Sequence, residues 1–199
     1  MAQGIVLASG SATRAGMLRN AGVPFTAITP RVDEEALRAS LAVEEVSPRD
    51  MSDALAEMKA LRVSQRQPGD LVIGSDQILA LDRTVFAKAE TREDARDTLR
   101  QLSGLRHSLL SAAVICEDGR PVWRHVTEVK LQMRTLTDSY IDSYLDRNWP
   151  AVQGAVGAYH VEGEGIRLFS AITGDYFAIL GMPLLPLLNY LITRGLIDG

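Results

Sequence analysis

The stretch LASGSATRAGML, residues 7–18, decides the fold because it carries the chain from a buried strand into a helix. A short apolar run, Ile5–Ala8, ends in Ser9-Gly10-Ser11, and helical spacing begins at Arg14. Small residues let backbone N–H groups approach an anion closely, and the dipole of a helix N-terminus favours negative charge. An arginine beside them completes a grip on phosphate. The alternative is an ordinary serine-capped helix with a solvated arginine, and the Gly-x4-Gly-Lys pattern of a P-loop is absent.

The rest of the chain alternates between strand and helix patterns, which predicts an α/β fold. Helix-capping residues begin three further helices at Ser47, Thr91 and Thr137, and a last helix begins near Pro183. The turn Glu117-Asp118-Gly119 joins two long strands into a hairpin. The predicted strands cover residues 3–8, 25–29, 71–73, 107–116, 121–133, 166–172 and 176–180. No repeat or linker interrupts the pattern, so we expect a single domain over residues 1–199.

Composition narrows the classes of protein to which the chain belongs. Its 199 residues are 46% apolar and 23% charged, which is ordinary for a globular domain. The net charge of −4 argues against a nucleic-acid binder. Cys116 is the only cysteine, and no signal peptide or membrane span is visible. We therefore expect a cytoplasmic protein with no membrane and no nucleic-acid partner.

Asp76 is the first candidate for chemistry. It interrupts the apolar segment DLVIGSDQILALD, residues 70–82, and an unpaired buried carboxylate is costly. One interpretation is a turn residue that caps nearby amides. The other is a metal ligand or general base at the end of a strand, where open α/β sheets place their sites.

Other charged residues have equally ordinary explanations when they are taken singly. Lys59 lies near the apolar side of a helix, which fits a lysine whose stem packs on apolar surface. Lys88 follows a strand, and Glu34 belongs to an acidic group typical of solvated surface. The three histidines show no metal-ligand spacing, and no nucleophilic triad is visible.

Taken together and in order, these segments resemble the Maf family of nucleoside triphosphate pyrophosphatases, also described as septum formation inhibitors. LASGSATRAGML is similar to the family opening Leu-Ala-Ser-x-Ser-Pro-Arg-Arg-x-x-Leu-Leu. The other similar blocks are VDEEA, ALAEMKA, VIGSDQILALDRTVFAKAE, LRQLSGLRHSLLSAAVI, GAYHVEGEG and GDYFAILGMPL. The resemblance implies a mixed central sheet flanked by helices, two lobes around a deep cleft as in inosine triphosphatases, and a homodimer.

The resemblance also implies the roles of the cationic and hydroxyl residues. Ser9, Ser11 and Arg14 would grip phosphate, and Lys59 and Lys88 would bind and neutralise the polyphosphate. The reaction would be hydrolysis of the α–β phosphoanhydride of a nucleoside triphosphate, which needs charge neutralisation and an aligned water.

The carboxylates and the substrate follow from the same resemblance. Glu34 and Asp76 would hold a divalent cation, Mg²⁺ or Mn²⁺, or activate water, with Asp76 as the catalytic residue. Gln77 and Glu162 would contact the substrate, and both are similar to the branch of the family that acts on 7-methyl-GTP. We therefore expect a metal-dependent pyrophosphatase for a modified nucleotide such as 7-methyl-GTP.

Two alternatives remain open at this point. The first is a pyrophosphatase of the same family that acts on dTTP or UTP, a branch that typically has a threonine after the aspartate. The other alternative is a non-catalytic nucleotide-binding regulator of septum formation. Two departures from the family pattern favour that regulator, because Thr13 replaces an Arg or Trp and Gly154-Ala155 replaces an Asp-Lys pair.

Overall fold

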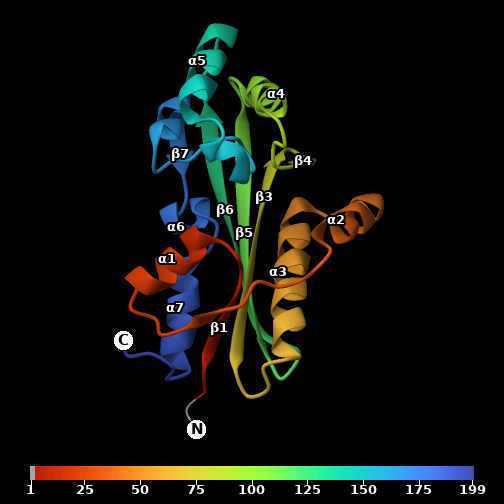
Figure 1. The fold of residues 1–199 in the computed structure, drawn as a ribbon, viewed down its shortest axis with the longest axis vertical. Helices are drawn as coiled ribbons and strands as arrows, with labels where there is room; N and C mark the ends of the chain where they lie inside the picture. The colour runs from red at the N-terminus through yellow and green to blue at the C-terminus, as the bar shows by residue number, and fades with distance from the viewer. Residues whose placement is uncertain (1–2) are drawn as a thin grey trace. The chain divides into compact units, whose positions relative to one another are not determined.

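The computed structural model describes residues 3–199, which form a seven-stranded mixed sheet with helices on both faces (Figure 1). The strand order is β2-β1-β3-β5-β6-β7, with β4 paired to β3. Strand β1 pairs in parallel with β2 and β3, whereas the β3–β4 and β6–β7 pairs are antiparallel. In chain order the elements are β1 (Ile5–Ala8), α1 (Ala12–Asn20), β2 (Thr26–Ala27), α2 (Glu34–Val43), α3 (Pro48–Ser64), β3 (Leu71–Leu81), β4 (Thr84–Phe86), α4 (Arg92–Leu102), β5 (Arg106–Glu117), β6 (Arg120–Met133), α5 (Asp138–Asn148), the 3₁₀ helices η1 (Ala151–Gly154) and η2 (Glu164–Leu168), β7 (Phe169–Thr173), α6 (Tyr176–Ile179) and α7 (Leu184–Thr193). The predicted α/β fold with a mixed central sheet is confirmed.

The chain divides into two compact units, and strands β3, β5 and β6 contribute residues to both. The first unit contains residues 1–77, 110–127 and 175–199, and the second contains residues 78–109 and 128–174. Within residues 3–199, no helix is both long enough and apolar enough to cross a bilayer. The deep cleft that the resemblance implies stays a prediction.

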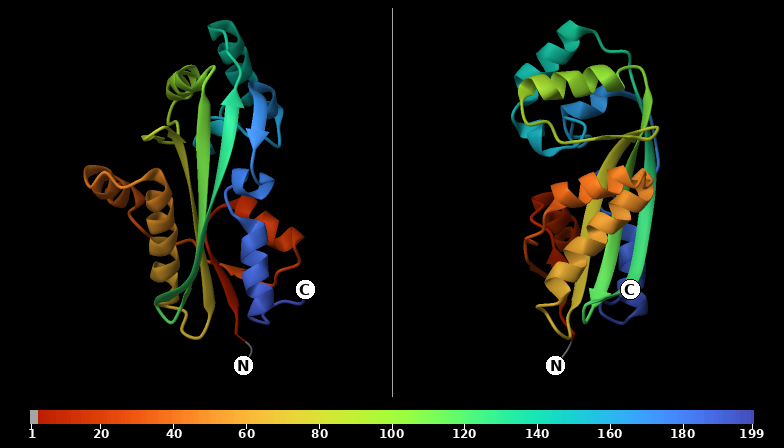
Figure 2. Two further views of the ribbon diagram at one scale, coloured as in Figure 1. Left: turned by 180° about the vertical axis from the view of Figure 1, so that it is seen from behind. Right: turned by 90° about the vertical axis from the view of Figure 1, so that its right-hand side faces the viewer.

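The core of the first unit follows from the alternation of side chains along β1 and β3. Ile5, Leu7, Leu71 and Ile73 pack with α1 and α7 on one face of the sheet. The residues that alternate with them, Val6, Ala8 and Val72, pack with Val63 of α3 on the other face. Figures 1 and 2 accordingly show α3 on the opposite side of the sheet from α1 and α7. Both faces of these strands are buried, as is usual for parallel pairing.

Helix α3 approaches the sheet closely at Gly74. A Cβ atom at this position would lie 2.2 Å from the Ala56 carbonyl oxygen and 2.7 Å from the Ala60 amide nitrogen. On the same helix, Ser47 is the N-cap and accepts a hydrogen bond from the Asp50 amide, as predicted. The glycine therefore sets how near α3 comes to β3, and α3 carries Lys59 against the sheet at that depth.

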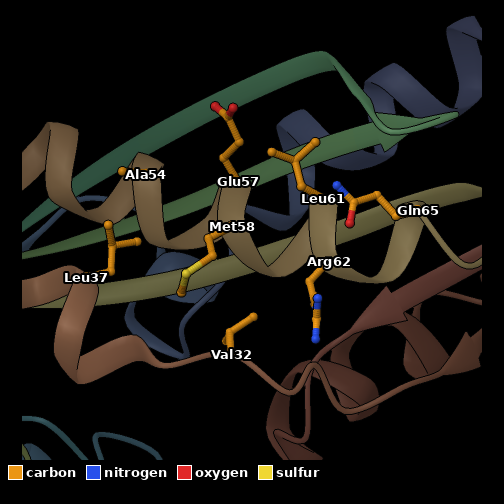
Figure 3. Close-up of a pocket in the computed structure, with 8 residues that line it drawn as sticks. All are labelled: Val32, Leu37, Ala54, Glu57, Met58, Leu61, Arg62 and Gln65. Atoms are coloured by element: carbon orange, nitrogen blue, oxygen red, sulfur yellow. The ribbon is translucent and has the colours of Figure 1, made fainter.

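Helix α2 was not predicted from the sequence, although Leu37 and Leu41 lie one helical turn apart, and none of its ten residues is buried. Its N-cap is Asp33, which accepts a hydrogen bond from the Ala36 amide. An open groove of about 490 Å³ separates Leu37 and Val32 from Met58 on α3 (Figure 3). The groove is lined by Val32, Leu37, Ala54, Glu57, Met58, Leu61, Arg62 and Gln65. Helix α2 thus rests on α3 with little buried surface.

The strand predicted at residues 176–180 is wrong, because Tyr176–Ile179 form the helix α6. Asp175 accepts a hydrogen bond from the Ala178 amide and begins a helical turn, which Gly181 ends with a φ of +105°. The segment Gly74-Ser75-Asp76-Gln77 was also expected to leave the strand, yet β3 continues through it. In this case the polar side chains find partners within the first unit, so the strand is not interrupted.

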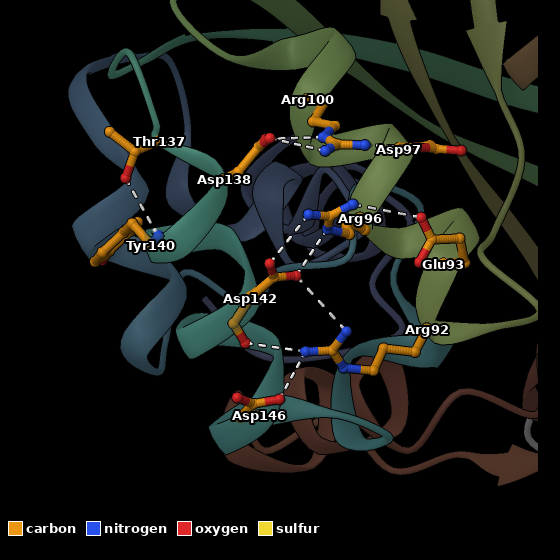
Figure 4. Close-up of polar contacts among 10 residues, drawn as sticks. All are labelled: Arg92, Glu93, Arg96, Asp97, Arg100, Thr137, Asp138, Tyr140, Asp142 and Asp146. Atoms are coloured by element: carbon orange, nitrogen blue, oxygen red, sulfur yellow. Dashed lines mark hydrogen bonds and ion pairs between the residues drawn. The ribbon is translucent and has the colours of Figure 1, made fainter.

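The second unit contains a pair of helices joined by ion pairs, α4 and α5 (Figure 4). Arg92 binds Asp146, Arg96 binds Asp142 through two nitrogens, and Arg100 binds Asp138 in the same way. These arginines recur every four residues along α4, so they share one face of the helix. Thr91 begins α4 and Thr137 begins α5, as expected from the sequence, and Thr91 forms a reciprocal capping pair with Asp94.

His107 lies buried in the second unit, where its Nε2 is 2.8 Å from the Tyr159 hydroxyl. Burial lowers the pKa of the imidazole to about 4. A neutral histidine packed against Tyr159 and Phe169 is a core residue. This agrees with the absence of metal-ligand spacing in the sequence.

We expect the substitution Glu164→Gln to lower the Tm at pH 7 but to lose its effect in acid. Hydrogen bonds from Arg147 and then Asn148 lower the pKa of the Glu164 carboxyl from 4.5 to about 2. A carboxyl whose pKa is lower in the folded protein stabilises it fully above the unfolded pKa, and this contribution disappears as the pH falls through the folded pKa. Thermal unfolding of both proteins should show a Tm difference that shrinks between pH 4.5 and pH 2. A difference that stays constant over this range would contradict the assignment.

Candidate functional site

The candidate site lies in the first unit at the carboxyl ends of β1 and β2. Strand β1 leads into α1 on one face of the sheet, and β2 leads into α2 and α3, with α3 on the opposite face (Figure 1). The last residue pair between β1 and β3 is Ala8 with Gly74, so the residues that follow on β3 pass beyond the end of β1. Adjacent parallel strands whose connections go to opposite faces leave a crevice for ligands at their carboxyl ends.

The serine loop folds as a helix cap in the described structure. Ser11 is the N-cap of α1, and its hydroxyl accepts a hydrogen bond from the Arg14 amide at 3.3 Å. Ser9 is buried, and its hydroxyl accepts from the Ser11 amide at 3.2 Å. Ser11 is therefore a helix cap, as the ordinary interpretation expects, but Arg14 is not the solvated arginine of that interpretation. Each hydroxyl still has a proton to donate, so a contact with phosphate stays a prediction.

Lys59 is the centre of the site and joins both predicted carboxylates. Its ammonium lies 2.6 Å from Oδ1 of Asp76 and 2.9 Å from Oε2 of Glu34. The side chains of Lys59 and Asp76 are only 8% and 5% exposed, whereas that of Glu34 is 43% exposed. Strand β3 supplies Asp76, helix α3 supplies Lys59, and the first turn of α2 supplies Glu34. The structure thus brings together three residues that are far apart in the sequence.

Arg38 is a further member that the sequence did not reveal. Its Nη2 lies 3.1 Å from Oδ2 of Asp76, the carboxylate oxygen that Lys59 does not contact. Arg38 follows Glu34 by four residues on α2, so the two share one face of that helix. This spacing was the available signal, and it was missed because α2 itself was not predicted.

Arg14 approaches the same charges from α1. Its Nε donates a hydrogen bond of 2.8 Å to the Gly181 carbonyl. The two terminal nitrogens of the guanidinium take no part in that bond. Desolvation lowers the pKa of Arg14, and attraction to Asp76 and Glu34 opposes that change. The guanidinium stays charged because its reference pKa is far above neutral.

Gln77 lies on the face of β3 opposite Asp76, since neighbouring side chains of a strand alternate. Its amide nitrogen donates to the carbonyls of Ala178 and Ile179 at 2.9 Å and to the Ser111 hydroxyl at 3.0 Å. Gln77 therefore fixes the end of α6 against the sheet. Its predicted contact with substrate is not tested by these bonds and stays a prediction.

Lys88 and Glu162 belong to the second unit. Lys88 is exposed just after β4, and Glu162 lies in a turn with its carboxylate 3.5 Å from Nδ1 of His160. Their predicted contacts with polyphosphate and base stay predictions. Of the predicted residues, the structure joins Glu34, Lys59 and Asp76 by direct contacts.

The two carboxylates fit a divalent cation that is completed by substrate. Asp76 and Glu34 already converge on one positive charge, the Lys59 ammonium. Mg²⁺ prefers oxygen ligands and is usually held by one or two carboxylates together with phosphate oxygens and water. Among residues 3–199, no group of three or more His, Cys, Asp or Glu side chains could hold a metal by itself. The donor set suits a cation that arrives with a polyphosphate.

A family model described as Maf-like protein matches residues 4–194. The chain belongs to the Maf family. Three Maf relatives bear the name nucleoside triphosphate pyrophosphatase. The protein from Ruegeria pomeroyi is 56% identical over 194 residues, and that from Roseobacter denitrificans is 52% identical over 195; each alignment covers 98% of both chains. The protein from Caulobacter vibrioides is 49% identical over 191 residues, which is 96% of both chains.

The segments that carried the resemblance to the Maf family supply three of the residues described above. The Maf opening supplies Arg14, the acidic segment supplies Glu34, and the helix ALAEMKA supplies Lys59. Of these, Lys59 contacts Asp76, Glu34 contacts Lys59, and Arg14 feels the charges of both carboxylates. Arg38 lies outside these quoted segments and is added by the structure alone.

Proposed function

We propose that this protein is a nucleoside triphosphate pyrophosphatase, which hydrolyses the α–β phosphoanhydride and releases a nucleoside monophosphate and pyrophosphate. The observation that carries the proposal is the contact of the buried Lys59 ammonium with both Asp76 and Glu34. Such a cluster would add little to the stability of the fold, because the desolvation cost of a buried ion pair often exceeds its Coulombic attraction. The names of the relatives support the same activity.

The charges of the site suit a polyphosphate. The cations Arg14, Arg38 and Lys59 outnumber the carboxylates Asp76 and Glu34, which leaves a local net charge of +1. Arg14 and Lys59 bind phosphate oxygens, and the amides at the start of α1 face the same anion. Asp76 accepts a proton from the attacking water or orients it. Lys88 contributes a further positive charge to the polyphosphate.

Glu34 and Asp76 are the residues that would hold a divalent cation, Mg²⁺ or Mn²⁺. When bound, such a cation neutralises charge on the phosphate oxygens and lowers the pKa of a water molecule. The protein's own part is to hold the two carboxylates together, which Lys59 does by contacting both.

Within this activity we propose 7-methyl-GTP as the preferred substrate. The support is Gln77 after the catalytic aspartate, together with Glu162, whose partly exposed carboxylate can offset the positive charge of a methylated purine. The proposal includes a cytoplasmic location and a homodimer, as in the family that the sequence resembles.

The decisive experiment measures pyrophosphate release by the purified protein with Mg²⁺ or Mn²⁺ on 7-methyl-GTP, GTP, UTP, dTTP and CTP. We expect release from 7-methyl-GTP to be fastest. Faster release from dTTP or UTP would contradict 7-methyl-GTP as the preferred substrate but would still support the pyrophosphatase reaction. Binding of a nucleotide without release of pyrophosphate from any of the five would refute the enzyme and favour the nucleotide-binding regulator.

A further inference from the structure

We propose that Arg38 is a substrate-displaced counter-ion of Asp76. Its guanidinium pairs with Asp76 in the nucleotide-free protein and moves onto the phosphates of a bound nucleoside triphosphate. The inference rests on the proposed function, because it assigns a role in that same site. It adds a residue that none of the quoted Maf segments contains.

The first step of the argument is that both oxygens of Asp76 are occupied by cations. Lys59 lies 2.6 Å from Oδ1 and Arg38 lies 3.1 Å from Oδ2. A carboxylate in two charge-assisted hydrogen bonds has less negative potential left for a metal ion or a water proton. At least one of these two cations must therefore leave the Asp76 carboxylate before it can bind a metal ion or accept a proton from water.

The second step is that the two cations differ in freedom. The Lys59 side chain is 8% exposed and extends from α3, which packs into the core of the first unit. The Arg38 side chain is 29% exposed and extends from α2, which has no buried residue. Elements with few buried apolar contacts open at low cost in free energy. Arg38 is accordingly the cation that can leave.

The third step is that α2 has room to adjust. The groove of about 490 Å³ lies between α2 and α3, with Leu37 of α2 across from Met58 (Figure 3). Leu37 directly precedes Arg38, and α2 has no buried residue, so the segment that carries Arg38 can shift without disrupting the core. The neighbouring Glu34 would keep α2 attached through Lys59.

The fourth step is the preference of the guanidinium itself. Arginine binds phosphate with two parallel hydrogen bonds, whereas only one bond joins Arg38 to Asp76. A triphosphate carries several negative charges, so it competes well against one carboxylate. When Arg38 transfers, Oδ2 of Asp76 is released in the same event that binds substrate. The site thereby couples activation of Asp76 to the presence of a polyphosphate.

The first test measures the affinity of the nucleotide-free protein for Mn²⁺ by calorimetric titration. Arg38→Gln removes the competing cation, so we expect Mn²⁺ to bind about tenfold more tightly than to the wild type. The matched control is Arg62→Gln, which removes an equal charge from an exposed arginine on the groove wall and should leave the affinity unchanged. Equal Mn²⁺ affinity in Arg38→Gln and the wild type would overturn the counter-ion role.

The second test measures binding of inorganic triphosphate in EDTA. We expect about tenfold weaker binding by Arg38→Gln and an intermediate loss for Arg38→Lys, which keeps the charge but not the paired donors. Unchanged triphosphate affinity would overturn the transfer to phosphate. Circular dichroism establishes whether Arg38→Gln is folded. If it is not, Arg38→Lys gives the same test.

Both tests are binding measurements and need no turnover. A wild type that binds triphosphate but releases no pyrophosphate from any nucleotide refutes the proposed function by itself. Opposite changes in Mn²⁺ and triphosphate affinity in Arg38→Gln support the displacement. A merely structural Arg38 would weaken both ligands together, and that outcome overturns the proposal.

Discussion

The substitution Asp76→Asn should lower kcat by about 10³-fold while the protein stays folded. The amide is neutral, so it cannot accept a proton from water or hold a cation at the end of β3. Lys59 keeps Glu34 as a partner, and Arg38 is partly exposed to solvent, so neither cation is left buried without a counter-charge. We expect the loss in kcat at saturating nucleotide with added Mn²⁺, measured as pyrophosphate release.

Asp53→Asn is the matched control for this loss. Asp53 is also an aspartate of the first unit in an ion pair with an arginine, Arg124, but it contacts none of the residues around Asp76 in the described structure. Its substitution removes the same charge and should leave kcat within about twofold of the wild type. Turnover by Asp76→Asn within tenfold of the wild type would show that Asp76 does not carry the reaction.

The sequence predicted the parts of the fold that are controlled by local chemistry. The caps at Ser47, Thr91 and Thr137 satisfy amides a few residues away, so their effect is visible in a short window. The hairpin turn is similar, since Asp118 and Gly119 adopt the positive φ angles of +48° and +72° that a tight turn requires.

The errors arise where tertiary contacts override the local pattern. Helix α2 buries none of its residues and shows only one apolar pair at helical spacing, Leu37 and Leu41, so it was overlooked although Asp33 is a suitable N-cap. The apolar residues 176–180 resembled a strand, but Gln77 and Ser111 bind the carbonyls at the end of α6. These partners are far away in the sequence. No local signal identifies them.

The site shows the same division. Asp76 was a candidate from the sequence pattern itself, and the roles of Glu34 and Lys59 followed from the family resemblance, but the contacts among the three did not. The sequence gives no reason for one lysine to touch both carboxylates, because three separate elements meet only in the folded chain. Arg38 was invisible for a simpler reason, since its position depends on a helix that was not predicted.

Gly74→Ala should have the second large effect, because it separates the two elements that hold Lys59 and Asp76. The new Cβ would lie 2.2 Å from the Ala56 carbonyl oxygen, and this neighbour is helix backbone rather than a flexible side chain. Helix α3 would have to move away from β3, at a cost of about 3 kcal/mol in the free energy of unfolding. A shift of Lys59 by about 1 Å should lower kcat/KM by about 10²-fold.

Urea unfolding and pyrophosphate release at a temperature where the variant is folded measure these two effects separately. Gly16→Ala is the control, because nothing lies within 4 Å of a Cβ at Gly16 and this residue is inside α1. Alanine there should raise the free energy of unfolding by about 0.5–1 kcal/mol and leave turnover unchanged. If Gly74→Ala were as stable and active as Gly16→Ala, the close approach of α3 would not control the site. A loss of activity that persists in the folded Gly74→Ala protein would instead place the spacing between α3 and β3 among the requirements of catalysis.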